Sequence, residues 1–171
     1  MHWMRQKPQK LTNQDLDGAL AVMISFQNYV QHADGKVSVL AVAHAGAAAT
    51  VAAQAGSAAR LAHAGLVAGN ALLGLFLLGF LVSGYHMLQT IRPVLRPPST
   101  RSRYGITGVA GHLPPAADED VATRIDEAWA MTRLLAQIAE RKYRHVSSAL
   151  PWTGLTLVSA ISLTVLIATW R

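Results

Sequence analysis

Residues 99–105, with the sequence STRSRYG, combine side chains that are able to bind a nucleotide. Arg101 and Arg103 carry guanidinium groups whose geometry matches phosphate oxygens, and Tyr104 offers an aromatic face on which a base stacks. The same composition is typical of a basic loop that flanks a membrane. The residues alone leave both interpretations open.

Histidine is the second residue type with possible chemistry, because the chain has seven. None is three or four residues from another, and no carboxylate pattern accompanies them, so no metal site is expected. His44 differs from the others because it lies in an apolar stretch, where an ionisable side chain points to a functional role. The alternative is a neutral imidazole that shares a hydrogen bond with a Ser, Thr or Gln of a neighbouring helix.

Asp34 and Lys36 are the last charged residues before this apolar stretch, and Gly35 between them marks an expected bend. Two positions apart on a helix, their side chains face different ways. In one interpretation Lys36 extends its ammonium group to lipid headgroups. In the other, Asp34 pairs with a base on a second cytoplasmic helix and locks the two helices together. Both residues are therefore candidates for a structural or gating role, as is His44.

Three apolar stretches must position these residues: 37–59, 66–88 and 149–170. At about 1.5 Å per residue, about 20 helical residues cross a hydrocarbon core of about 30 Å, so each stretch predicts a transmembrane helix. Pro151 is expected in the first turn of the third span, where its missing N–H does least harm. A soluble helical protein is the alternative, but residues 71–82 offer no polar face to water.

The distribution of Lys and Arg predicts the orientation. Residues 1–36 carry four and residues 92–145 carry nine, whereas residues 60–65 and the C-terminal residue carry one each. The positive-inside rule therefore places the N-terminus and the long loop in the cytoplasm. The net charge is +6, but the bases flank the apolar stretches and form no single face, so nucleic-acid binding is not expected.

Two amphipathic helices are predicted on the cytoplasmic side. Residues 12–33 begin with Thr12 as the cap and Asp15 as its partner in a capping-box arrangement. Residues 118–147 begin with three acids and end with bases, as the helix dipole favours, and place Trp129 on their apolar stripe. Because each leads into a span on the same side, the two helices are expected to pack together as a small stalk.

The predicted fold is an all-α integral membrane protein with three transmembrane helices and two amphipathic cytoplasmic helices that form a small stalk. The many small residues of the first span predict close contact with other helices, including those of other subunits. The chain has no cysteine, nucleophile elbow, P-loop or paired carboxylates, so no catalytic residue and no enzyme are predicted. The predicted organisation is a cytoplasmic part (1–36), a membrane hairpin (37–91), a linker rich in Pro, Arg and Gly (92–117), a cytoplasmic helix (118–148) and a third span (149–171).

Four short motifs, taken in order, resemble the transmembrane effectors of bacterial Pycsar anti-phage systems. NYVQHADGK precedes the first span, IRP follows the second, STRSRYG lies in the linker, and AQIAERKYRHVSSAL leads into the third span. The resemblance covers residues 12–170.

This resemblance implies a partner cyclase that makes cyclic CMP or cyclic UMP during phage infection. The effector would sense this nucleotide, without any other cofactor, and impair the bacterial inner membrane so that infection is abortive. The phosphate would bind Arg or Lys and the pyrimidine an aromatic face. Binding would change helix packing or the assembly of a homo-oligomer through the Ala-rich first span. The candidate ligand contacts are Arg101, Arg103, Tyr104, Lys142 and Tyr143.

Two other functions are compatible with the three predicted spans. One is a non-enzymatic membrane anchor or assembly subunit whose cytoplasmic helices dock a soluble partner. The other is a small holin-like or transport accessory protein. The neighbouring gene distinguishes them, because a nucleotide cyclase there favours the effector.

Overall fold

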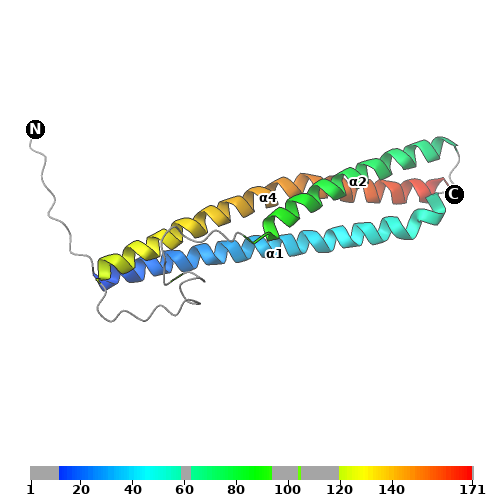
Figure 1. Cartoon of the computed structure of the whole chain (residues 1–171). Coiled ribbons are helices and arrows are strands. Elements are labelled where there is room, and N and C mark those ends of the chain that lie inside the picture. The colour runs from blue at the N-terminus through cyan, green and yellow to red at the C-terminus, as the bar shows by residue number, and fades with distance from the viewer. Residues whose placement is uncertain (1–11, 59–62, 94–103, 105–119, 171) are drawn as a thin grey trace, which may run out of the picture. The chain divides into compact units, whose positions relative to one another are not determined.

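Three long helices form the described part of this computed structural model (Figure 1). The structure describes residues 12–58, 63–93, 104 and 120–170. Helix α1 spans Asn13–Ala58, α2 spans His63–Ile91 and α4 spans Val121–Thr169. Within these ranges the regular structure is entirely helical, with no strand, as the sequence predicts.

All three helices are long and apolar enough to cross a bilayer. Helix α2 has 29 residues, close to the length that a tilted span needs. Helices α1 and α4 have 46 and 49 residues, about twice the length that crosses a hydrocarbon core of about 30 Å. If they span a bilayer, a large part of each therefore lies outside the hydrocarbon. The membrane boundaries predicted within α1 and α4 stay predictions.

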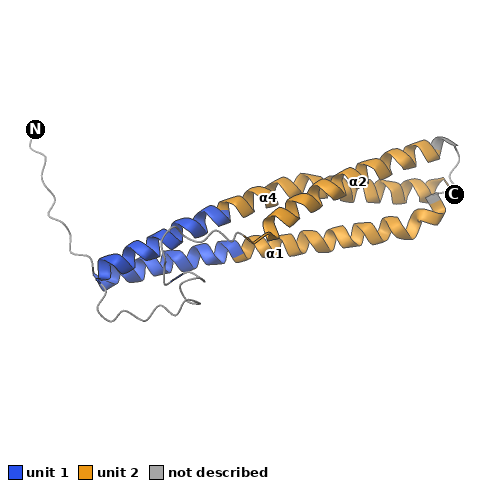
Figure 2. Ribbon diagram, in the orientation of Figure 1, with its two compact units in different colours: residues 1–30, 94–139 blue, residues 31–93, 140–171 orange. Residues whose placement is uncertain are grey.

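The chain divides into two compact units, which Figure 2 shows in different colours. Unit 1 comprises residues 1–30 and 94–139, and unit 2 comprises residues 31–93 and 140–171. Helices α1 and α4 each contribute to both units, whereas the described residues of α2 belong to unit 2.

The structure does not support the predicted stalk of two distinct amphipathic helices. Helix α1 stays α-helical through Gly35, where a bend is predicted, and α4 continues without a break into the predicted third span. Pro151 consequently lies in the interior of α4 and not in a first turn. Because proline has no N–H, the carbonyl of Ser147, four residues earlier, lacks its α-helical donor.

The start of α1 is held by Thr12 and Asp15, in agreement with the sequence. The backbone N–H and the hydroxyl of Thr12 both donate to Asp15 Oδ2 at 2.8 Å, and the N–H of Asp15 donates to the carbonyl of Thr12 at 3.1 Å. These two hydrogen bonds favour the ionised carboxylate and lower the pKa of Asp15. Of the two hydrogen bonds of a capping box, this contact contains the one from the Thr12 N–H to the Asp15 side chain. The Thr12 hydroxyl donates to the same carboxylate and does not accept from a backbone N–H.

Unit 1 has an apolar core where α1 and α4 meet. Leu16 and Ala19 of α1 are buried against Ile125 and Ala128 of α4, and Tyr104 packs against this cluster. Trp129 is 40% exposed, which corrects its predicted place on the buried stripe. Unit 1 is therefore packed as a water-soluble helix pair is, with aliphatic side chains inside.

In unit 2 all three helices meet, and each buried cluster takes residues from all of them. One such cluster contains Ala47 of α1, Phe76 of α2 and Ala160 of α4. Between α2 and α4 the buried residues include hydroxyl groups: the Ser83 hydroxyl donates to the carbonyl of Ala149 at 3.2 Å and lies 2.8 Å from Thr153 Oγ1. Such hydroxyl contacts between helices are typical of membrane bundles.

At Gly79 the backbone of α2 lies close to α4. A methyl group at this position would lie 2.8 Å from Thr156 Oγ1 and 3.0 Å from the carbonyl oxygen of Trp152. Glycine is therefore required if the two backbones are to pack at this distance.

The buried positions of α4 follow a seven-residue repeat in both units. Successive buried residues are alternately three and four positions apart, which is the spacing of a left-handed coiled-coil seam. In unit 1 they are Ile125, Ala128, Thr132, Leu135 and Ala139; in unit 2 they are Val146, Ala149, Thr153, Thr156, Ala160, Leu163 and Ile167, and Ser159 is buried in addition to this series.

Candidate ligand site

The candidate site lies in unit 2, where a turn of α1 faces a turn of α4. Lys142 donates from Nζ to Asp34 Oδ1, and the Lys142 side chain is 14% exposed whereas that of Asp34 is 48% exposed. An ammonium group that has lost most of its water needs an anion beside it, so the Asp34 carboxylate offsets the desolvation of Lys142. The structure thus places Asp34 beside a base of α4, and its gating role stays a prediction.

Lys36 contacts the neighbouring residue of α4. Its Nζ lies 4.8 Å from the centroid of the Tyr143 ring, within the distance of a cation–π interaction. Two consecutive residues of α4 are therefore each held by a charged residue of α1, one through an ion pair and one through an aromatic ring. A ligand that binds either partner must compete with a contact between the two helices.

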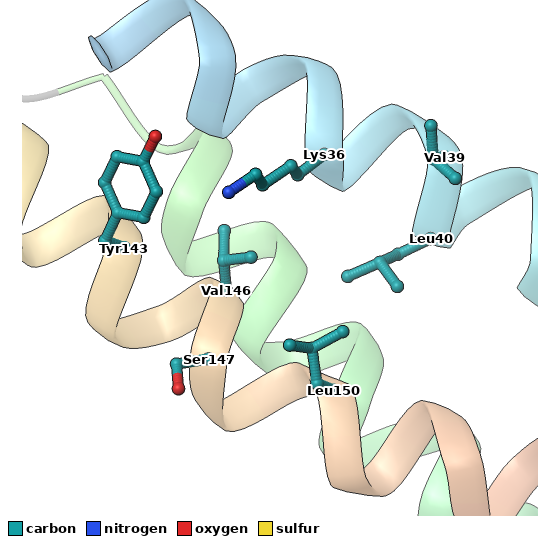
Figure 3. A pocket seen from close by; sticks show the side chains of 7 residues that line it. All are labelled: Lys36, Val39, Leu40, Tyr143, Val146, Ser147 and Leu150. Carbon is teal, nitrogen blue, oxygen red and sulfur yellow. The ribbon is translucent and has the colours of Figure 1, made fainter.

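A cavity of 470 Å³ lies beside these contacts (Figure 3). Lys36 and Tyr143 lie together in the view, and Leu40 and Leu150 lie further along the two helices. The wall is mainly aliphatic, with an ammonium group, a phenol and a hydroxyl as its polar side-chain groups. The lining residues are Lys36, Val39, Leu40, Tyr143, Val146, Ser147 and Leu150.

A second cavity, of 430 Å³, shares part of this wall and is more polar. It is also lined by Lys36, Val39 and Tyr143, but it adds Gln31 and His32. An amide and an imidazole supply hydrogen-bond donors and acceptors that the first cavity lacks. The polar cavity is therefore better suited to a base or a ribose, and the apolar one to a hydrocarbon chain.

Two histidines form a pair between α2 and α4 in the same unit. Nδ1 of His86 lies 3.3 Å from Nδ1 of His145, so one nitrogen donates and the other accepts. Partial burial, followed by the positive charges of His86, Arg141 and Arg144, lowers the pKa of His145. Residue spacing does not predict this pair, since 59 residues separate its members.

His44 is buried, with its ring 5.2 Å from that of Phe80. Its Nδ1 lies 3.0 Å from the carbonyl oxygen of Leu40 one turn earlier, and because a carbonyl only accepts, Nδ1 is the donor of this hydrogen bond. Nε2 has no hydrogen-bond partner among the described residues. The observed bond is thus to the backbone of its own helix and not to a Ser, Thr or Gln of a neighbouring one.

The other predicted contact residues lie elsewhere. Tyr104 packs against the core of unit 1, and Arg101 and Arg103 lie outside the described residues. Lys142 and Tyr143 are adjacent and share the site with Asp34 and Lys36. Their binding of a ligand stays a prediction. Within the part of the chain that the structure describes, no group of three or more His, Cys, Asp or Glu is placed to hold a metal ion.

Comparison with known proteins identifies the family. A family model described as the Pycsar effector protein domain matches residues 19–170. No curated protein and no solved structure gives a significant match. The family consists of effectors of anti-phage defence that act in a system with a cyclase. Because the match spans most of the sequence and includes all three membrane-compatible helices, the chain belongs to the Pycsar effector family.

Proposed function

We propose that this protein is a membrane effector that is activated by cyclic CMP or cyclic UMP and then impairs the bacterial inner membrane, which makes phage infection abortive. The observation that carries the proposal is the family match over residues 19–170, on a chain with three helices long and apolar enough to span a bilayer. The partner cyclase would supply the nucleotide. The Lys and Arg distribution supports a cytoplasmic N-terminus and long loop, on the side where a cytosolic nucleotide arrives.

The contacts between α1 and α4 offer a way to couple binding to a change of structure. A phosphate that binds Lys142 competes with the Asp34 carboxylate, and a pyrimidine that stacks on Tyr143 competes with Lys36. Ligand binding would therefore weaken both contacts and favour a state in which these helices pack differently. The polar cavity beside Gln31 and His32 supports this placement. Arg101 and Arg103 lie outside the described residues and Tyr104 packs in unit 1, so their predicted ligand contacts stay predictions, separate from those of Lys142 and Tyr143.

The output of such a change would be assembly in the membrane. Much of the α1 surface in unit 2 consists of exposed small residues, which allow close backbone contact with a helix of another subunit. A homo-oligomer formed through this surface would disturb the bilayer or line a path through it. The exposed small residues include Ala41, Ala45, Gly46, Ala49, Ala52, Ala53 and Gly56.

The test uses the full chain reconstituted in vesicles that contain a fluorescent dye. Cyclic CMP or cyclic UMP is expected to bind and to release the dye, while cyclic AMP serves as the nucleotide control. Lys142→Gln is expected to abolish both responses, whereas Asp34→Asn leaves the ammonium group free and is expected to bind the nucleotide at least as tightly. Protection against phage without binding of either pyrimidine nucleotide would contradict the proposal, as would co-purification with an obligatory soluble partner.

A further inference from the structure

The apolar cavity of unit 2 has a chemical gradient that matches an amphiphile better than a nucleotide. Lys36 and Tyr143 lie near one end, Val39 and Leu40 lie about one turn further along α1, and Leu150 lies about two turns further along α4 (Figure 3). A cyclic nucleotide would leave ribose and base groups against aliphatic walls, which is costly when their hydrogen bonds are not replaced. A hydrocarbon chain has no such groups, so it packs against these walls without that cost.

We propose that this cavity binds one anionic phospholipid of the surrounding bilayer. The phosphate lies on the Lys36 ammonium, and one acyl chain lies along Val39, Leu40 and Leu150. The cavity volume of 470 Å³ falls within the range of about 300–1,000 Å³ that is usual for small-molecule sites. The second acyl chain stays in the bilayer.

The charge of the site selects an anion. Lys36 has no carboxylate partner among the residues that the structure describes, because Asp34 is paired with Lys142. Its ammonium group is held over the Tyr143 ring, next to the cavity, where a phosphate adds to the cation–π contact without displacing it. Lys36 is also the last charged residue of α1, so it stands where the chain composition changes from polar to apolar.

The headgroup charge distinguishes the lipids that the site takes. Phosphatidylglycerol carries a net negative charge that the Lys36 ammonium attracts, whereas phosphatidylcholine places a positive choline group beside the same phosphate. The site therefore selects phosphatidylglycerol over phosphatidylcholine by charge.

Native mass spectrometry of the full chain in detergent, with equal amounts of phosphatidylglycerol and phosphatidylcholine added, tests the proposal without any nucleotide. We expect one phosphatidylglycerol to be retained in preference. Lys36→Gln is expected to reduce this preference about tenfold, since a charge-assisted hydrogen bond is lost. Lys36→Arg is expected to keep it, and Ser147→Leu, which fills the cavity, to reduce retention of both lipids.

Arg144→Gln is the matched control, because Arg144 is exposed, pairs with Glu140 on the same helix and does not line the cavity. Equal loss of preference in Arg144→Gln and Lys36→Gln would show general attraction to anionic lipid and overturn the proposal. Unchanged retention in Lys36→Gln would overturn it too. Competition by glycerol phosphate alone would show a phosphate site without a chain site, and would also overturn it. The proposal does not rest on the proposed function, since lipid retention is measured without nucleotide.

Discussion

In unit 1 the contact between α1 and α4 buries Leu16 and Ile125, whereas in unit 2 the contact between α2 and α4 buries Ser83 and Thr153. On the outer surfaces, unit 1 exposes few large hydrophobic side chains and unit 2 exposes many. Among the described residues, the exposed large hydrophobic side chains of unit 1 are Ile24, Tyr29 and Trp129, and those of unit 2 form a much longer series that includes Leu75, Leu77, Leu78, Leu81 and Ile161.

This difference agrees with the predicted membrane boundaries. In water, burial of apolar area drives helices together, so aliphatic residues belong at the contact. In lipid the surroundings are as apolar as leucine, so helices associate through close packing and hydrogen bonds, and small or hydroxylated residues belong there. Both units use the same seven-residue repeat along α4, so their contacts differ in residue type and not in spacing.

The largest effect is expected from Ile125→Ser in the core of unit 1. Ile125 is 5% exposed, so the substitution removes buried apolar area and leaves a cavity, at a cost of about 2–5 kcal/mol. Thermal unfolding in detergent measures this loss. Ile24→Ser, at a position that is 53% exposed, is the control and should change stability by less than about 0.5 kcal/mol. Equal losses of stability in the two variants would contradict the assignment of Ile125 to the interior and Ile24 to the surface of unit 1.

Gly79→Leu is expected to have the next largest effect, in unit 2. The new side chain meets Thr156 Oγ1 and the Trp152 carbonyl, so α2 and α4 must separate, at a cost of about 3 kcal/mol. Gly74→Leu, in the same helix with open space around it, is the matched control and should be tolerated. A thermal shift for both variants, read against the wild-type chain, decides whether close backbone packing holds unit 2 together.

The ion pair of the candidate site should respond unequally to loss of either partner. Asp34→Asn leaves the more buried Lys142 without its anion and should cost about 1–3 kcal/mol, whereas Lys142→Gln leaves the half-exposed Asp34 and should cost less. A double-mutant cycle by thermal unfolding measures the coupling. Glu140→Gln, which breaks an exposed pair with Arg144, should cost no more than about 0.5 kcal/mol. A reversed order for the two site variants would contradict the burial assigned to them.

Ser83→Ala tests the hydroxyl contact of unit 2 at a smaller scale. It removes the bonds to Ala149 and Thr153, and an interhelical bond of this kind contributes about 0.6 kcal/mol on average in a membrane. The measurement is detergent unfolding, with Ser25→Ala, whose hydroxyl bonds only to its own helix, as control. A loss above about 2 kcal/mol would show that polar contacts in unit 2 outweigh packing.

The smallest expected effect is a pH dependence through the histidine pair. The pKa of His145 is lowered in the folded chain, so the unfolded chain binds the proton more readily. The neutral form therefore contributes stability that is present above the ordinary pKa of about 6.5 and is lost as the pH falls through the lower, folded value. Unfolding temperatures measured from about pH 5 to pH 8 should rise with pH, and His145→Asn should flatten that rise. If the unfolding temperature of His145→Asn rises with pH as steeply as that of the wild-type chain, other groups cause the pH dependence.

The sequence determined the helical class, the three apolar stretches and the family, because these depend on composition and on short motifs. It also determined the start of α1, since Thr12 and Asp15 are only three residues apart. Trp129 shows the limit of this reasoning. A broad apolar stripe includes it, but the seven-residue repeat buries its neighbour Ala128 and exposes the indole.

Only the tertiary structure decided which side chains meet. The Lys36–Tyr143 contact, the His86–His145 pair and the Ser83–Thr153 hydrogen bond each join residues more than 50 positions apart. Periodicity identifies the buried face of each helix, but the axial register between two helices depends on all their packed side chains together, including the missing side chain of Gly79. That register is a property of the assembled bundle, and the candidate site exists because of it.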